Sequence, residues 1–153
     1  MPLPPNAKIV TRQVLRSRRE AWRRRGRTVV FTNGCFDLLH RGHVEYLREA
    51  RSLGDALLVG VNADAGVRAL KGPGHPLMGQ EDRAALVAAL EAVSYVTIFE
   101  EPSVAALVAE LGPDVLVKGG DYGVDEIVGR DLVESSGGVV RSLSLWPGVS
   151  TSA

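Results

Sequence analysis

The feature that most constrains this fold is a regular alternation between short apolar runs and segments with helical spacing. The apolar runs lie at residues 28–33, 56–61, 95–99, 114–118 and 139–145. The run at residues 56–61 is apolar without interruption, which is typical of a strand that is covered on both faces. Their alternation with helices predicts right-handed crossovers and a parallel sheet between two helical layers. We therefore expect a Rossmann-like, doubly wound α/β fold with a five-stranded parallel sheet.

The segments between these runs carry the helix signals. Val44, Leu47 and Ala50 fall at helical spacing, and Gly54 is expected to end that helix. Further helices are expected over residues 80–93, 102–111 and 126–136. In open parallel sheets, ligands bind beyond the carboxyl ends of the strands, near the point where strand order reverses. That rule directs attention to the loops at residues 32–43, 62–80 and 118–125.

Length and charge suggest one domain with an uneven charge distribution. The chain has 153 residues and a formal net charge of zero, which argues against a nucleic-acid surface over the whole domain. Its arginines crowd residues 1–27, expected to form a basic helical segment ahead of a domain over residues 28–153. We find neither a long apolar run nor a secretory signal, and Cys35 has no disulfide partner. These features predict a cytoplasmic protein with no membrane partner.

Two histidines follow the first apolar run and mark the start of the next helix. His40 and His43 are three residues apart with Gly42 between them, so both imidazoles lie near one face of the first turn. Exposed backbone N–H groups and the helix dipole favour an anion there, and Gly34 would allow a sharp turn close to a ligand. Zinc is the alternative, but only Cys35 and His75 remain to complete a ligand set. The position between strand and helix favours phosphate.

The sequence around these histidines resembles a known family. The run GCFDLLHRGHVEYLREA at residues 34–50 is similar to the signature of the cytidylyltransferase-like nucleotidyltransferases, whose hallmark is His-x-Gly-His. Within that superfamily it most resembles the heptose 1-phosphate adenylyltransferases, often the C-terminal half of a bifunctional heptose kinase/adenylyltransferase. Further matching motifs, in the family's order, are LGDALLVGVNAD, LKG, EDRAALVAALEAV, PDVLVKGGDY, IVG and PGVSTS. The resemblance covers roughly residues 28–152 and implies the HUP/nucleotidyltransferase type of Rossmann-like fold.

The resemblance also implies a reaction and its participants. A phosphate oxygen of heptose 1-phosphate attacks the α-phosphorus of ATP, giving ADP-heptose for cell-envelope polysaccharide and expelling pyrophosphate. Mg²⁺ would be bound through the nucleotide phosphates, with no direct protein ligand, and relatives lead us to expect a homodimer. The catalytic residues would be His40, His43 and Lys71, the last as a mobile-loop cation. The nucleotide would be bound by Cys35, Phe36, Gly42, Arg83, Ser150, Thr151 and Ser152, and the substrate side would be lined by Asp37, Asp121 and Tyr122.

Several of these assignments have plainer alternatives. Lys71 could be a solvated loop lysine, Arg83 a surface arginine, and Asp37 a turn aspartate that accepts backbone hydrogen bonds. Asp121 could be an incidental acid in a tight turn, and residues 150–152 a polar tail.

The sequence also departs from the family at three places. His75 stands where the family usually has Arg, and Ser152 replaces a Thr. The family's last helix would begin where the chain ends, at Ala153, so we expect a missing C-terminal helix to weaken nucleotide binding. Residues 1–27 are too few to encode the kinase half of the bifunctional relatives.

Two other functions remain open at this stage. On the same scaffold, CTP could be used with glycerol 3-phosphate or a phosphoamine, or ATP with phosphopantetheine. A function of another class would be nucleic-acid binding by the basic segment, where Arg12, Arg16, Arg19 and Arg23 recur at helical spacing. The plainer interpretation of that segment is a helix whose Val14, Leu15 and Trp22 pack on the domain. Nucleic-acid binding would not require His40 or His43.

Overall fold

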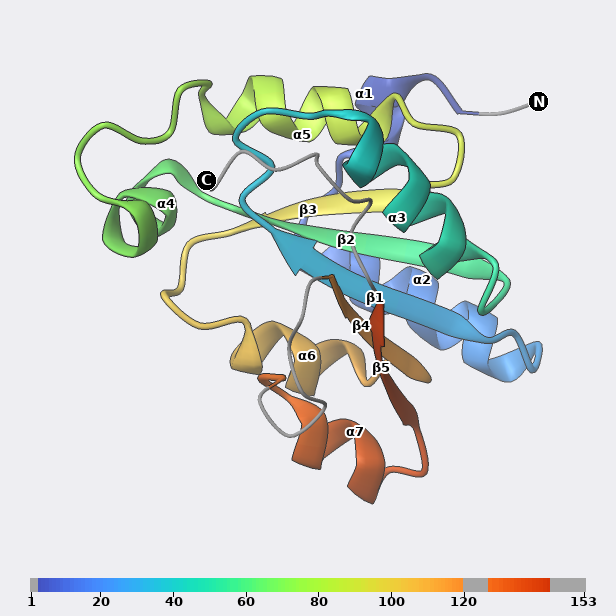
Figure 1. Ribbon diagram of the computed structural model, residues 1–153. Coiled ribbons are helices and arrows are strands. Elements are labelled where there is room, and N and C mark those ends of the chain that lie inside the picture. The colour runs from blue at the N-terminus through green and yellow to red at the C-terminus, as the bar shows by residue number, and fades with distance from the viewer. Residues whose placement is uncertain (1–2, 120–126, 144–153) are drawn as a thin grey trace.

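A parallel sheet with helices on both faces forms the molecule (Figure 1). The computed structural model describes residues 3–119 and 127–143. The sheet has five strands in the order β3-β2-β1-β4-β5, and every adjacent pair is parallel. The strands are β1 (Val29–Gly34), β2 (Ala56–Asn62), β3 (Tyr95–Phe99), β4 (Val115–Gly119) and β5 (Val139–Leu143). All five predicted strands and the predicted fold class are confirmed.

One helix of the described residues was not expected from the sequence. In the described part of the chain the helices are α1 (Pro5–Lys8), α2 (Arg12–Arg24), α3 (Arg41–Arg51), α4 (Asp64–Lys71), α5 (Gln80–Ala88), α6 (Ala105–Leu111) and α7 (Arg130–Ser135). The helices α1 and α2 lie within the segment expected to be helical, whereas α4 was missed, since it lies in the stretch expected to be a loop. Lys71 is therefore the last residue of a helix, so its placement in a loop was wrong. In these ranges, no helix has the length and apolar character needed to cross a bilayer.

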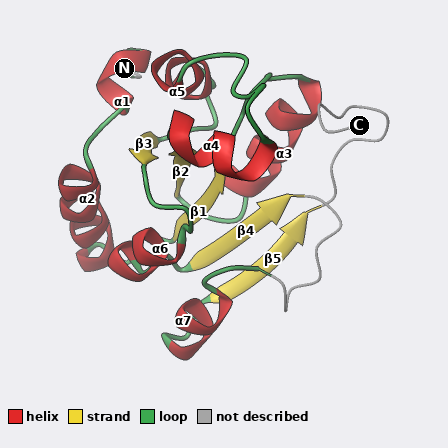
Figure 2. Ribbon diagram, turned by 90° about the vertical axis from the view of Figure 1, so that its left-hand side faces the viewer, coloured by secondary structure: helices red, strands yellow, loops and turns green. Residues whose placement is uncertain are grey.

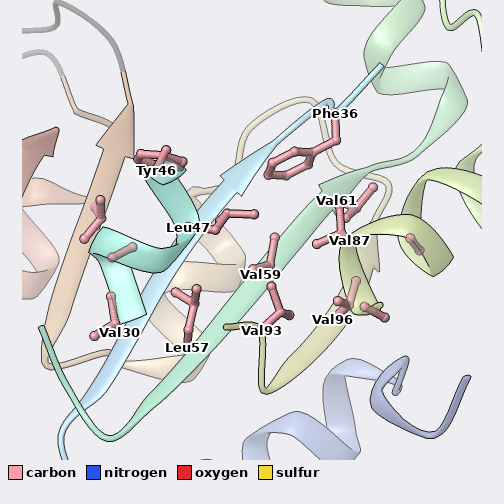
Figure 3. Close-up of a cluster of buried hydrophobic side chains, with 14 of the residues drawn as sticks. Val30, Phe36, Tyr46, Leu47, Leu57, Val59, Val61, Val87, Val93 and Val96 are labelled. Carbon is pink, nitrogen blue, oxygen red and sulfur yellow. The ribbon is translucent and has the colours of Figure 1, made fainter. Parts of the chain in front are cut away.

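Alternate residues of each strand supply two cores, one on each face of the sheet. Val30, Leu57 and Val59 face α3 and α5, together with Tyr46 and Leu47 of α3 (Figure 3). The intervening residues of the strands face α2, α6 and α7 and form the second cluster, which includes Leu15, Val29, Phe31, Leu58, Leu107 and Leu116. Figure 2 shows these helices on opposite sides of the sheet. The period of two along each strand therefore places both helical layers.

The order of the strands fixes where a ligand can bind. The chain moves from β1 to β2 and β3 on one side, and then crosses to β4 and β5 on the other. The loops that follow β1 and β4 consequently diverge, which leaves a crevice at their carboxyl ends. At this point the hydroxyl of Tyr46 of α3 forms a hydrogen bond with the hydroxyl of Thr32 of β1.

The N-terminal segment packs against the rest of the chain. Ile9 forms a parallel bridge with Val96, and Leu15 of α2 is fully buried in the second core. Arg19 is 3% exposed, and its guanidinium donates to the carbonyl oxygens of Leu111 and Gly112, where α6 ends. The packing predicted for Leu15 and Trp22 is confirmed. That predicted for Val14 is wrong, since this side chain is 41% exposed.

We expect Leu15→Ala to lower the free energy of unfolding by about 2–5 kcal/mol, because it leaves a cavity in a packed core. Val14→Ala is the matched control, since Val14 is the preceding residue of the same helix and is exposed. We expect the control to change stability by no more than about 0.5 kcal/mol. Chemical denaturation of both variants measures the difference. Equal stabilities would show that α2 does not stabilise the domain.

Candidate active site

The side chains of His40 and His43 cap the N-terminal end of α3 through hydrogen bonds to backbone N–H groups. His40 is the N-cap residue in extended conformation, and its Nδ1 accepts from the backbone N–H of Gly42 at 3.0 Å. In return, Nδ1 of His43 accepts from the backbone N–H of His40 at 3.3 Å. The two rings lie with their centroids 4.0 Å apart. The sequence spacing therefore brings the two imidazoles together, as predicted, in the manner of a capping box.

These bonds determine which ring nitrogens can meet a ligand. A nitrogen that accepts from an N–H carries no proton, so each neutral ring holds its proton on Nε2. The site therefore has two Nε2–H donors beside each other. The N–H groups of Gly42 and His43 are both used inside the protein, by Nδ1 and by the carbonyl oxygen of His40. The expectation of exposed backbone N–H groups is therefore wrong for Gly42 and His43, whereas the imidazole donors remain available to a ligand.

His43 is a neutral donor at neutral pH. Burial lowers its pKa, and the neighbouring His40 and Lys71 lower it further, to about 4. Lys71 is exposed, and its charge also lowers the pKa of Asp37 and opposes the rise in the pKa of Cys35. The end of α4 thus lies within electrostatic reach of the histidine pair. The catalytic role of Lys71 stays a prediction.

The turn between β1 and α3 depends on Phe36. It is the one non-glycine residue with positive φ, 50°, in the described ranges, a conformation that is uncommon for a bulky side chain. Its ring is buried, and its centroid lies 5.5 Å from that of His43. A Cβ atom on Gly34 would stand 3.0 Å from Cε2 of this ring. The absent side chain of Gly34 therefore makes room for Phe36, whereas the sharp turn predicted at Gly34 occurs two residues later.

Arg83 joins three loops beneath the site. Its side chain is fully buried, so the surface alternative was wrong. Nη1 donates to the carbonyl oxygens of Cys35 at 2.6 Å and Asn62 at 2.7 Å, which follow β1 and end β2. Nε donates to the carbonyl oxygen of Met78, and Nη2 pairs with Asp64 at 2.8 Å. The guanidinium is used mainly to position backbone, and its predicted contact with the nucleotide stays a prediction.

Asp37 holds the loop that precedes α5. Its side chain is 3% exposed and accepts from Nδ1 of His75 at 2.5 Å and from the backbone N–H of Leu77 at 2.6 Å. Burial alone would raise its pKa, but these two hydrogen bonds outweigh burial and lower it. Asp37 therefore accepts a backbone hydrogen bond, as its plainer alternative stated, from a loop far along the chain. The contact that His75 makes, where the family usually has Arg, is this hydrogen bond to Asp37.

Five predicted site residues lie outside the described residues: Asp121, Tyr122, Ser150, Thr151 and Ser152. The sequence analysis did not name three polar residues at or next to the carboxyl ends of the strands, namely Asn33, Asn62 and Lys118. Burial lowers the pKa of Lys118, and its Nζ donates to the carbonyl oxygen of Asn33 at 3.5 Å. The available signal was a polar residue that ends an otherwise apolar strand.

We expect Arg83→Lys to lower the free energy of unfolding by about 3–5 kcal/mol, because an ammonium cannot replace the fork that binds three carbonyl oxygens and Asp64. Arg68→Lys is the matched control, since Arg68 is exposed on α4. Denaturant titration of both variants provides the comparison. Equal stability of the two variants would contradict the positioning role.

The charge of Lys71 offers a second test of the site. We expect the imidazole of His43 to titrate near pH 4 in an NMR experiment and to keep its proton on Nε2 above that pH. Lys71→Ala should raise this pKa, because it removes a nearby positive charge that disfavours the imidazolium. Arg68→Ala, three residues earlier on α4, should leave it unchanged. An unaltered titration in Lys71→Ala would place that lysine away from the histidine pair.

Comparisons with known proteins agree with this geometry. The chain is 54% identical to the bifunctional protein HldE of Syntrophotalea carbinolica and 51% identical to that of Geobacter sulfurreducens, over 95% of this chain and 30% of each relative. The chain thus spans about a third of their length. A solved structure, the lipopolysaccharide core biosynthesis protein from Thermoplasma volcanium, is 31% identical with a TM-score of 0.65, covering 79% of this chain and 98% of that one. The profile of the cytidylyltransferase-like family matches residues 31–152, and the chain belongs to that family.

Proposed function

We propose that this domain transfers the adenylyl group of ATP to heptose 1-phosphate, giving ADP-heptose and pyrophosphate. The observation that carries the proposal is the pair of imidazoles at the start of α3, whose Nε2–H donors stand together at the strand-order switch. Two adjacent N–H donors suit the oxygens of a phosphate group, although their size alone excludes few other ligands. The similarity to the HldE proteins and to the lipopolysaccharide core protein supports this choice of reaction.

The chemistry needs positioned donors more than a covalent intermediate. A phosphate oxygen of the sugar phosphate forms a bond to the α-phosphorus, and the bond to the bridging oxygen breaks, so that pyrophosphate leaves with the electron pair. Negative charge grows on the oxygens around the phosphorus during this exchange. His40 and His43 donate to those oxygens from Nε2, and Lys71 adds positive charge from the end of α4. Because Phe36 and Arg83 fix the surrounding loops, the donors are already in place before the substrate binds.

Magnesium enters this proposal with the nucleotide. Among the described residues, no cluster of three His, Cys, Asp or Glu side chains could hold a metal ion. The carboxylates at the site are occupied, since Asp37 pairs with His75 and Asp64 pairs with Arg83. Mg²⁺ commonly binds through substrate phosphates and waters, so the donor set fits an ion carried by ATP. The ion would neutralise phosphate charge there.

The choice of base and acceptor rests on the relatives. A CTP-dependent transfer to glycerol 3-phosphate or a phosphoamine would use the same histidines. The homodimer and the cytoplasmic location likewise stay predictions. The decisive experiment measures pyrophosphate release with Mg²⁺, offering ATP or CTP against heptose 1-phosphate, glycerol 3-phosphate and phosphopantetheine. Release with ATP and heptose 1-phosphate alone supports the proposal, and release with CTP alone rejects the adenylyl assignment.

For His43→Ala, we expect turnover to fall by ~10²–10³-fold, the effect of removing one donor to the transition state. Glu49→Ala, an exposed residue of the same helix, is the matched control and should retain full activity. Single-turnover measurement of pyrophosphate release gives both rates, and thermal unfolding shows whether each variant is folded. A folded His43→Ala protein with near-normal turnover would remove His43 from the mechanism.

A further inference from the structure

The loop between α4 and α5, at residues 72–79, contains no buried residue. Figure 1 shows this loop as the connection between the two helices. Even the apolar side chain of Leu77 is exposed. Because the hydrophobic effect scales with the apolar surface removed from water, such a loop gains little from it. Polar contacts must therefore determine where the loop lies.

Two side chains outside the loop supply these contacts. Near its end, the carbonyl oxygen of Met78 accepts a hydrogen bond from Arg83. In its middle, one oxygen of Asp37 accepts from the backbone N–H of Leu77 at 2.6 Å, and the other accepts from Nδ1 of His75 at 2.5 Å. A buried carboxylate needs such donors in place of water. Movement of the loop away from Asp37 would therefore break two hydrogen bonds to a charged group, which are stronger than neutral ones.

His75 differs from Leu77 because it bonds to Asp37 through its side chain. Leu77 donates a backbone N–H, which every residue except proline has, whereas the imidazole of His75 can be removed by substitution. This imidazole is 34% exposed, so it reaches the buried carboxylate from the surface of the molecule. Asp37 follows Phe36 in the turn between β1 and α3. His75 thus joins the loop to the turn that leads to the histidine pair.

The loop begins directly after Lys71, whose side chain has no support of its own. Lys71 is the last residue of α4 and is exposed, and it forms no hydrogen bond or ion pair within residues 3–119 and 127–143. Gly72 ends the helix with a φ of 97°, in open space. Helix ends fray readily, so the last turn of α4 depends on what holds the chain beyond it. The position of the Lys71 charge therefore depends on the loop.

We propose that His75 is a positioning residue that holds the loop to Asp37 and thereby keeps Lys71 beside the histidine pair. Its action is indirect, because Lys71 and not His75 supplies positive charge to the phosphates. The proposal rests on the proposed function for the part that Lys71 plays in the reaction. The position of Lys71, in contrast, can be measured without any reaction.

The imidazole of His43 reports the position of Lys71. Burial, His40 and Lys71 lower the pKa of His43 to about 4, and His75 is not among the groups that act on it. If His75→Ala releases the loop, Lys71 moves away and the pKa of His43 should rise, as expected for Lys71→Ala. Combining the two substitutions should raise it no further than Lys71→Ala alone, because the group that His75 positions is then absent. NMR titration of the whole chain measures all three variants.

His75→Asn separates the hydrogen bond from a general effect on the loop. The amide nitrogen of asparagine lies at a similar distance from the backbone as Nδ1 and can donate to the carboxylate, but it carries no charge. We expect His75→Asn to keep the pKa of His43 close to that of the wild type. Glu81→Ala, which removes an exposed side chain from the first turn of α5, is the matched control and should also leave this pKa unchanged. Thermal unfolding checks that each variant is folded.

The kinetic test measures pyrophosphate release from ATP with Mg²⁺ and heptose 1-phosphate. We expect His75→Ala to lower kcat by roughly 10-fold, the effect of losing one hydrogen bond to a charged group, and by no more than Lys71→Ala does. The KM for heptose 1-phosphate should change less, by about twofold at most, because the charge of Lys71 matters chiefly in the transition state. His75→Asn should recover most of the lost kcat.

The two readouts fail separately. A folded His75→Ala protein in which His43 titrates as in the wild type, or a His75→Asn protein that behaves like His75→Ala, overturns the proposal. A raised pKa of His43 in His75→Ala but not in His75→Asn supports it. That result together with no pyrophosphate release by the wild type would reject the proposed function and leave the positioning of Lys71 by His75 standing.

Discussion

The buried guanidinium of Arg83 is the interaction on which the rest of the site depends. Loops are the least constrained parts of a fold, and three of them meet at the carboxyl edge of this sheet. Arg83 holds the backbone of Cys35, Asn62 and Met78 with one planar group, and Asp64 balances its charge. A charge is costly to bury unless it is paired and bonded in this way. The groups that accept hydrogen bonds from Arg83 belong to these loops, so the same bonds hold the loops of the site in place.

The positions of the neighbouring site residues follow from the contacts of Arg83. Once Cys35 is fixed, Phe36 can occupy its left-handed conformation, and its ring lies against His43. Asp37 then reaches the loop before α5 through His75 and Leu77. At the end of β2, the carbonyl oxygen of Asn62 accepts a hydrogen bond from the same guanidinium. One set of backbone contacts thus organises the loops at the strand-order switch.

Sequence patterns predicted the strands well because apolar and β-branched residues dominate each strand and set it apart from the helical segments around it. They predicted the histidine pair because helical spacing alone brings His40 and His43 together. The patterns failed at α4, where a helix of eight residues was hidden beside a stretch rich in Gly and Pro. They could not give the burial of Arg83, whose partners lie up to 48 residues away in sequence, or the positive φ of Phe36. Both depend on tertiary contacts that no local pattern records.

Because His40 and His43 cap α3 through unprotonated ring nitrogens, the stability of the start of this helix depends on pH. To gain a proton on Nδ1, His43 must release the N–H of His40, so protonation removes one of the two side-chain hydrogen bonds that cap α3. The folded chain resists this until the pH approaches about 4, whereas a solvated histidine takes up its proton near 6.5. Between those values the unfolded chain binds more protons, so stability falls as the medium acidifies. The cap formed by the two histidines thus makes the start of α3 sensitive to acid.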